Sequence, residues 1–234
     1  TFTPDQPSGT VDVTFTFNAS SLKAKEVVVF ERLYIGDAEI AVHADIEDKD
    51  QTVSFIEPKI GTKATGKDGE KQLAISKTAT IIDKVKYEGL TVGEKYTLKG
   101  TLMDKASGKA LLVNGKAVTA ETTFTPEKAD GSVEVTFTFD ASALAGKQVV
   151  VFERLYIGDA EIAAHADIED KGQTVSFTEP KIRTSASGKD GEKQIAISRT
   201  ATIIDKVKYE GLTVGEKYTL KGILMDKATG KALL

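Results

Sequence analysis

The stretch that decides the fold is Val11-Asp12-Val13-Thr14-Phe15-Thr16-Phe17, in which apolar and polar side chains alternate strictly. Successive side chains of a strand point to opposite faces, so this pattern puts four large apolar side chains on one face. The alternation returns at 133–139 and in the segments 73–82, 95–102 and 117–124, which Gly and Asp-Gly turns separate. The sequence therefore predicts an all-β fold, built as an antiparallel β-sandwich.

The rest of the chain shows that this stretch belongs to a repeated unit. Residues 1–112 match residues 123–234 at a shift of 122 positions, with 21 differences among 112 pairs. A unit of 122 residues is the size of a domain and far longer than a solenoid repeat. The chain is therefore expected to contain tandem copies of one module.

The repeat also predicts where the modules divide. Glu-Pro-Lys-Ile occurs at 57–60 and again at 179–182, where Pro favours an extended connection. We expect one complete module at 57–181, the later part of a split or permuted module at 1–56, and the earlier part at 182–234. The two parts could complete each other between neighbouring copies of the chain, in a swapped pair, or within one chain if the termini of the complete module were close.

Composition excludes several classes of function. The net charge is −4 with the signs interspersed, which argues against nucleic acid as a partner. Cys is absent and there are two His, so disulfides, thiolate catalysis and a Cys- or His-based metal centre are not expected, and no cofactor is implied. No apolar run approaches the length of a membrane span, and no signal-peptide pattern opens the sequence.

Polar residues next to apolar strands are the candidates for chemistry, since their burial costs free energy unless partners are supplied. Glu153 follows the apolar run Val149–Phe152, which suits a strand covered on both faces; the ordinary explanation for it is an ion pair with Arg154. Asp83 follows the strand-like segment 79–82, where a turn-forming Asp is the ordinary expectation.

Three further positions stand out near the ends of the complete module. His165 precedes Gln173 by eight residues, and the charged segment 166–171 between them is typical of a solvated loop. A Gln at the start of a strand ordinarily faces solvent. Near the beginning of the module, Thr62 and Ala64 share one face of the alternating pattern, where a Thr is an ordinary strand residue.

Taken together, these residues resemble a known family. The run Val150-Val151-Phe152-Glu153, the segments 82–90 and 96–104, and His165-Ala166-Asp167-Ile168 followed by Gln173 are similar to the T-Q ester-bond domains, also called VaFE repeats. These are immunoglobulin-like domains of Gram-positive adhesins that are anchored to the cell wall. The resemblance covers essentially the whole chain.

The resemblance implies an autocatalytic crosslink, in which a Thr hydroxyl attacks a Gln side-chain amide, releases ammonia and leaves an ester. In the complete module it implies Thr62 and Gln173 as the bonded pair, with Asp83, Glu153 and His165 assisting. Thr65 is the rival nucleophile, but its counterpart in the repeat is a Ser. In the split module the implied residues are Thr184 and Gln51 as the bonded pair, with Asp205, Glu31 and His43 assisting.

The chemistry accounts for these residue types. A Thr hydroxyl needs a base, for which a neutral imidazole is suited, and the amide oxygen needs a donor as charge develops on it. Two carboxyl groups close together in a dry site cannot easily both ionise, so one would keep a proton and donate it to that oxygen.

We therefore expect a structural stalk module of an extracellular, cell-wall-anchored adhesin of unknown ligand, and no turnover enzyme, since the reacting groups are consumed. Two alternatives stay open at this point. One is a sandwich with an isopeptide bond between Lys and Asn or Asp, for which Asn18 and its counterpart Asp140 are candidates. The other is an adhesin module that binds a ligand through its loops.

Overall fold

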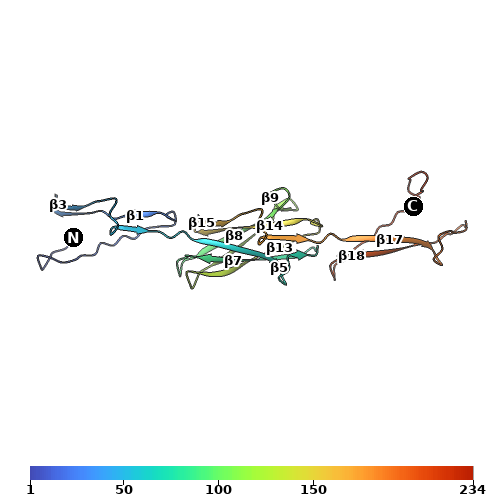
Figure 1. Cartoon of the computed structure of the whole chain (residues 1–234), viewed down its shortest axis with the longest axis horizontal. Coiled ribbons are helices and arrows are strands. Elements are labelled where there is room, and N and C mark those ends of the chain that lie inside the picture. Colours follow the sequence, from blue (N-terminus) through green and yellow to red (C-terminus); the bar gives the residue numbers. More distant parts are fainter. Residues whose placement is uncertain (234) are drawn as a thin grey trace.

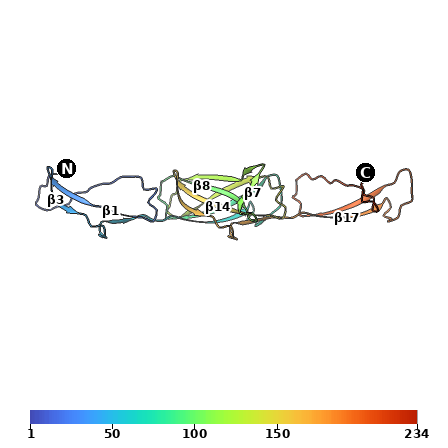
Figure 2. The ribbon, with the colours of Figure 1, turned by 90° about the horizontal axis from the view of Figure 1, so that it is seen from above.

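The computed structural model describes residues 1–233, which form three blocks in a row (Figure 1). The middle block extends from β5 (Lys59–Gly66) to β16 (Thr174–Phe177). The amino-terminal block contains β1 (Glu26–Val28), β2 (Glu31–Ile35), β3 (Ala38–His43) and β4 (Thr52–Ser54), and the carboxyl-terminal block contains β17 (Lys181–Gly188) and β18 (Ile203–Glu210). The two terminal blocks lie at opposite ends of the row, as a second view confirms (Figure 2).

The middle block is a β-sandwich. One sheet has the order β13–β7–β5, from β13 (Gly131–Phe139), β7 (Ala79–Glu88) and the first strand β5. The other has the order β12–β8–β14–β16–β6, from β12 (Thr119–Phe124), β8 (Tyr96–Asp104), β14 (Gln148–Ile157), β16 and β6 (Gln72–Leu73). On this sheet β15 (Ala160–His165) pairs with β14 and β9 (Lys109–Ala110) with β8, while β10 (Leu112–Val113) and β11 (Lys116–Ala117) form a separate hairpin.

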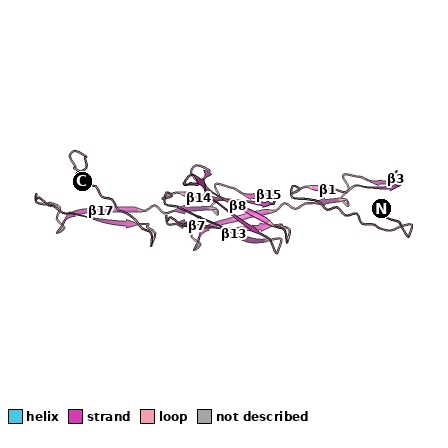
Figure 3. Cartoon of the chain, turned by 180° about the vertical axis from the view of Figure 1, so that it is seen from behind, coloured by secondary structure: helices cyan, strands magenta, loops and turns pink. Residues whose placement is uncertain are grey.

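The expectation of an all-β, antiparallel architecture is confirmed, with one exception. Across residues 1–233 the secondary structure consists of strands, turns and loops, without a helix (Figure 3). Every named strand pair is antiparallel except β16 with β6, which is parallel. This parallel pair places β16, the last strand of the middle block, beside β6, the short strand that follows β5.

Alternation explains the core. In β7 the inward positions Ala79, Ile81, Asp83, Val85 and Tyr87 are buried, while Lys84, Lys86 and Glu88 are exposed. The opposite sheet contributes buried residues such as Leu98, Leu102, Val149, Val151 and Leu155, and the sandwich closes around Phe137 from β13. The apolar run in β14 is covered on both faces as expected, because Val150 is also fully buried.

The stretch 11–17 itself does not form the strand that its alternation predicts. It has no assigned strand, and Val11, Phe15 and Phe17 are each more than half exposed, whereas its counterpart 133–139 lies in the strand β13, with Phe137 buried. The reason is the missing neighbour: β13 pairs with β7, and the counterpart of β7 is β18, at the far end of the chain. Alternation creates a strand only where a partner strand receives its hydrogen bonds.

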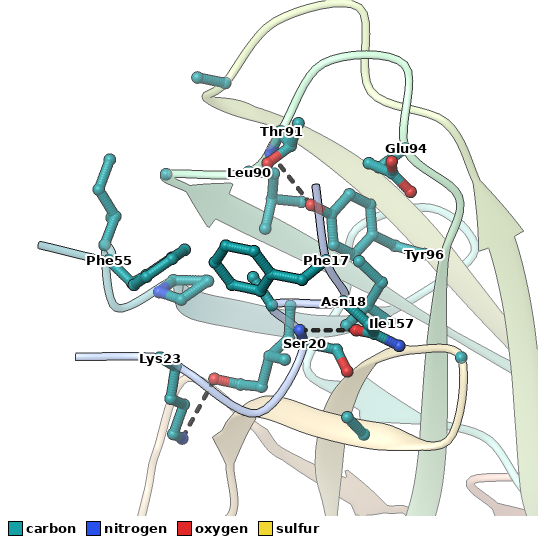
Figure 4. Close-up of a pocket in the computed structure, with 18 of the residues that line it drawn as sticks. Phe17, Asn18, Ser20, Lys23, Phe55, Leu90, Thr91, Glu94, Tyr96 and Ile157 are labelled. Atoms are coloured by element: carbon teal, nitrogen blue, oxygen red, sulfur yellow. Dashed lines mark hydrogen bonds between the residues drawn. The ribbon is translucent and has the colours of Figure 1, made fainter. Parts of the chain in front are cut away.

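Short connections join the blocks, and side chains contact one another across both junctions. At the first junction, Lys23 Nζ donates to the carbonyl of Ile162 at 3.2 Å, and Phe17 lies near Tyr96 in a hollow lined by both blocks (Figure 4). At the second, the Thr213 hydroxyl donates to the carbonyl of Ile75, and Glu216 accepts the backbone N–H of Lys77 at 3.2 Å. The described part of the chain has no helix long and apolar enough to span a membrane.

Candidate crosslinking site

The first half of the site lies on the sheet β13–β7–β5. Ile60, Thr62 and Ala64 occupy alternate positions of β5 that turn toward the interior, and the Thr62 hydroxyl oxygen is buried. Ala64 is opposite Asp83 in β7, and Thr62 is opposite Val85. Since directly opposed residues of a sheet share a face, Thr62 and Asp83 lie on the inner face as diagonal neighbours.

The second half lies on the facing sheet, where two strands follow each other along one edge of β14. Glu153 of β14 is opposite His165 at the end of β15, and two residues earlier the N–H of Val151 donates to the carbonyl of Gln173 at 3.1 Å. Along this edge of β14, β16 pairs with the earlier part of the strand and β15 with the later part. Val151 and Glu153 are two residues apart and point to the same face, so Glu153 faces the interior close to where the two neighbours meet. Glu153 and Gln173 are both fully buried.

The two halves meet through hydrogen bonds. The Gln173 amide nitrogen Nε2 donates to Asp83 Oδ1 at 3.4 Å. The backbone N–H of Ala64 donates to the carbonyl of Gly172 at 3.1 Å, which ties the first strand to the residue before Gln173. Four residues far apart in the sequence therefore gather in the core of the middle block: Thr62, Asp83, Glu153 and Gln173.

The cluster is short of hydrogen-bond partners. Within residues 1–233, the buried side-chain oxygens without a partner are Thr62 Oγ1, Asp83 Oδ2, both oxygens of Glu153, and Gln173 Oε1. A buried polar atom without a partner costs about 1–3 kcal/mol, and such atoms are rare in folded proteins. Their concentration in four residues from four different strands or strand ends is not expected of a core selected only for stability, and it makes this cluster the candidate functional site.

Burial sets the ionisation of the two carboxyl groups. It raises the pKa of Asp83 to about 7, against the opposing influence of the charges of His165 and Lys71. Burial, reinforced by the neighbouring charge of Asp83, raises the pKa of Glu153 to about 9. At neutral pH Glu153 therefore keeps its proton, while Asp83 is close to half ionised.

His165 is held at the edge of this cluster. Its Nε2 lies 2.6 Å from Asp170 Oδ2, and about a quarter of each side chain is exposed. Burial acts to raise the pKa of Asp170, but the hydrogen bonds from His165 and the Gly172 N–H outweigh it and lower that pKa. Ionised Asp170 accepts a hydrogen bond from the Nε2–H of His165, which fixes the orientation of the ring.

The ordinary explanations of these residues do not hold. Arg154 binds Glu161 at 3.0 Å and leaves Glu153 without an ion pair. Asp83 lies in the middle of β7 and makes no turn, and Gln173 faces the interior. The segment 166–171 is a largely exposed loop, as expected, but it also supplies Asp170 to His165.

Three contributors were missed by sequence reasoning. Gly100 of β8 lies opposite Glu153, and a Cβ there would come within 2.4 Å of Glu153 Oε1, so its lack of a side chain makes room for the carboxyl group. Asp170 anchors His165, and Lys71 binds backbone carbonyls on both sides of the site. Only Asp170 had a sequence signal, in its spacing of five residues from His165.

The residues implied for the split module are divided between the terminal blocks. Glu31 is opposite His43, whose Nε2 lies 2.6 Å from Asp48, and Gln51 follows in the amino-terminal block. In the carboxyl-terminal block, β17 carries Thr184 and β18 carries Asp205, which is opposite Ala186. Each block repeats half of the middle site, and the structure of one chain does not bring the halves together (Figure 1).

Among the described residues, no group of three or more His, Cys, Asp or Glu side chains could hold a metal ion. The cluster thus defines a class by its own residues: a β-sandwich whose first and last strands present a buried Thr and a buried Gln amide beside two carboxyl groups and a His.

The sequence profile described as "T-Q ester bond containing domain" matches residues 1–55, 58–177 and 180–233, so the chain belongs to this family. A search of curated proteins gives no match. Similar solved structures include a bacterial adhesin from Mobiluncus mulieris containing intramolecular disulfide, isopeptide and ester bond crosslinks, with 16% identity over 66% of this chain and 76% of that one, at a TM-score of 0.46. A glycosyl hydrolase family 2 member from Bacteroides cellulosilyticus has 17% identity over 57% of this chain and 16% of that one, at a TM-score of 0.37.

Proposed function

We propose that the middle block crosslinks itself through an ester between Thr62 and Gln173. The observation that carries this proposal is the buried cluster of unpartnered oxygens, which includes the nucleophile, the amide oxygen and both carboxyl groups. Membership of the T-Q ester bond family supports the same pairing.

The reaction balances within these residues. Thr62 Oγ bonds to the side-chain carbonyl carbon of Gln173, the C–N bond of the amide breaks, and ammonia leaves. Asp83, whose Oδ1 already accepts the Gln173 amide N–H, is placed to take the hydroxyl proton and deliver it to the departing nitrogen. This position favours Asp83 over His165 as the base, with His165 as a nearby charge that helps Asp83 to ionise.

Glu153 has the complementary role. Because its pKa is about 9, it keeps a proton at neutral pH and can donate a hydrogen bond to the oxygen on which negative charge develops. The dry surroundings strengthen that interaction and keep out the water that would hydrolyse the ester.

The consequence of the bond is mechanical. It would close a loop of 111 residues between the first and last strands of the block. By analogy with a disulfide of that span, it would stabilise the fold by about 4–5 kcal/mol. Tension entering at β5 would pass through the ester to the segment before β16, which suits a stalk module of an adhesin at the surface of a Gram-positive cell.

The isopeptide alternative receives less support from the side chains on which it depends. Asn18 Oδ1 accepts the backbone N–H of Ser20, and Asp140 Oδ1 accepts the backbone N–H and the hydroxyl of Ser142. Both residues close turns and have no hydrogen bond to a Lys among those that the structure describes.

Intact-mass spectrometry tests the proposal. The chain should be lighter than its sequence by one ammonia from the middle block, and Gln173→Ala should abolish that loss. Hydroxylamine should open the bond, since it cleaves an ester and spares an isopeptide. A full-mass chain, or a mass loss that persists in Gln173→Ala, would contradict the assignment.

We also propose that the terminal blocks can complete each other between copies of the chain, because one carries Thr184 and Asp205 and the other carries Glu31, His43 and Gln51. Concentrated protein should then give a ladder of covalent multimers on a denaturing gel. Gln51→Ala should remove the ladder and leave the crosslink of the middle block. Monomers alone at high concentration would refute the pairing between copies.

A further inference from the structure

Lys71 makes a set of contacts that the chemistry proposed above does not use. Its ammonium group donates to the carbonyls of Ala64, Gly172 and Thr174. An ammonium has three N–H donors, so these three backbone acceptors use all of them. Ala64 is two residues after the nucleophile Thr62, and Gly172 and Thr174 are the immediate neighbours of Gln173. One side chain thus binds the first strand and both sides of the electrophile.

The ammonium is also electrically coupled to the cluster. Burial, with the charge of Lys63, lowers the pKa of Lys71, while Asp83 and Asp170 oppose this change. In return, the charge of Lys71 lowers the pKa of Asp83. The other titratable groups that act on Asp83 are Glu153 from β14 and His165 from β15. Lys71 therefore favours the ionised form of the carboxyl group that takes the proton.

The contact of this lysine with the first strand does not depend on the last strand. In the carboxyl-terminal block its counterpart Lys193 donates to the carbonyl of Ala186, the counterpart of Ala64, although no last strand lies beside it. The preceding turn is also the same, since Gly66 N–H donates to Glu70 O and Gly188 N–H donates to Glu192 O, each at 2.8 Å. The ammonium is thus fixed on the first strand and available for the carbonyls that flank the incoming Gln.

We propose that Lys71 is a positioning residue for ester formation, which draws the backbone around Gln173 onto the strand that carries Thr62. Two reacting groups held in register react far faster than free ones, and a small misplacement is costly. This inference rests on the proposed Thr62–Gln173 ester and adds to it a residue outside the reacting set.

The test uses the full chain with Gln51→Ala, so that only the middle block can react. Protein purified in denaturant is refolded, and ammonia loss is followed by intact mass. Lys71→Met should slow the loss roughly tenfold to a hundredfold. The matched control is Lys59→Met, which removes an exposed charge from the same strand without touching the three carbonyls, and it should react at the parental rate.

A second readout separates positioning from mere support of the fold. Because Lys71 lowers the pKa of Asp83, the acid limb of the pH–rate profile should move to higher pH in Lys71→Met and stay in place in Lys71→Arg, which should also recover part of the rate. Folding is checked by thermal unfolding of Gln173→Ala chains with and without Lys71→Met.

A parental rate in Lys71→Met would overturn the inference. So would an equal slowing at every pH with no recovery in Lys71→Arg. If Lys71→Met does not fold, Lys71→Arg decides, and a folded Lys71→Arg chain that recovers none of the parental rate would also overturn the inference. If the parental chain itself loses no ammonia, the ester proposal fails, which is a different result from a crosslink that forms without Lys71.

Discussion

At the scale of single residues, the site is a set of polar side chains placed at core positions. Glu153 and Asp83 occupy inward positions of their strands where an aliphatic side chain would stabilise the fold more. Their burial raises both pKa values, and the neighbouring charges make the two increases unequal. In the proposed reaction, that inequality would separate a base, Asp83, from a proton donor, Glu153, in one pocket.

The first prediction concerns pH. Asp83 acts when ionised, so the rate of ester formation should rise as pH increases through about 7; Glu153 acts when protonated, so the rate should fall above about pH 9. The two limbs belong to the coupled pair. Glu153→Gln should lose the alkaline limb and keep the acid one. Initial rates of ammonia loss in a buffer series check this, and a flat profile would contradict the assignment of the two carboxyl groups.

The second prediction concerns Gly100. A Cβ at this position would lie 2.4 Å from both Glu153 Oε1 and Phe137 Cζ, so Gly100→Ala must displace the carboxyl group or the ring. We expect slower ester formation and a loss of about 1–3 kcal/mol in stability. The chain contains its own control, Gly222, the counterpart of Gly100, which has no atom within 4 Å of the added Cβ. Gly222→Ala should change neither the reaction of the middle block nor its urea midpoint.

At the scale of elements, the two-residue period of β5 decides which Thr hydroxyl faces the candidate site. Thr62 shares the inner face with Ala64, which is opposite Asp83, whereas Thr65 is opposite Ile82 and points to the other face. Strand register also places the residues beside β14. The hairpin between β14 and β15 puts His165 opposite Glu153, with a register shift after Leu155. Beyond Gln173, β16 pairs with the same edge of β14.

This gives the third prediction. Thr62→Val keeps the shape of the side chain and removes its hydroxyl, so it should abolish ammonia loss and lower the stability of the middle block by about 4–5 kcal/mol relative to the crosslinked protein. Thr65→Val should still crosslink. Intact mass and urea unfolding measure both effects. The opposite pattern, with Thr65 required and Thr62 dispensable, would mean that β5 presents its other face to Gln173.

At the scale of the whole molecule, the chain is a row of blocks joined by short connections (Figures 1 and 2). The loop containing Thr213 and Glu216 contacts the backbone of Ile75 and Lys77 across the second junction. The equivalent loop at the first junction contains Thr91 and Glu94 and lines the hollow between the blocks (Figure 4). Such contacts are expected to limit rotation between neighbouring blocks, which would keep the proposed stalk extended.

The fourth prediction tests this contact. Thr213→Ala with Glu216→Ala should loosen the second junction. Because the chain has no Cys, spin labels can be placed on Lys128→Cys and Lys206→Cys, which are exposed positions in the middle and carboxyl-terminal blocks. The distance distribution between the labels should broaden in the double variant. The matched control, Thr91→Ala with Glu94→Ala, should leave it unchanged; an equal effect of both pairs would show that these hydrogen bonds do not hold the second junction.

The sequence by itself determined the all-β architecture, the tandem repeat and the family, and each for a local reason. Strand periodicity is a property of neighbouring residues, so it can be read without knowing what the strand packs against. The five residue types of the site were identified from short motifs. Their surroundings were not, since a turn Asp, an ion-paired Glu and a solvent-facing Gln fit the same local sequence equally well.

Tertiary structure alone decided which of these positions are buried and which strands exist. Asp83 and Gln173 come into contact across 90 residues, and Lys71 reaches carbonyls more than 100 residues away, so no local pattern contains either contact. The stretch 11–17 and its near-copy in β13 have almost the same sequence, yet only the copy beside β7 is a strand. Burial and strand pairing depend on which partner is present in space, and that information lies outside any single segment of the chain.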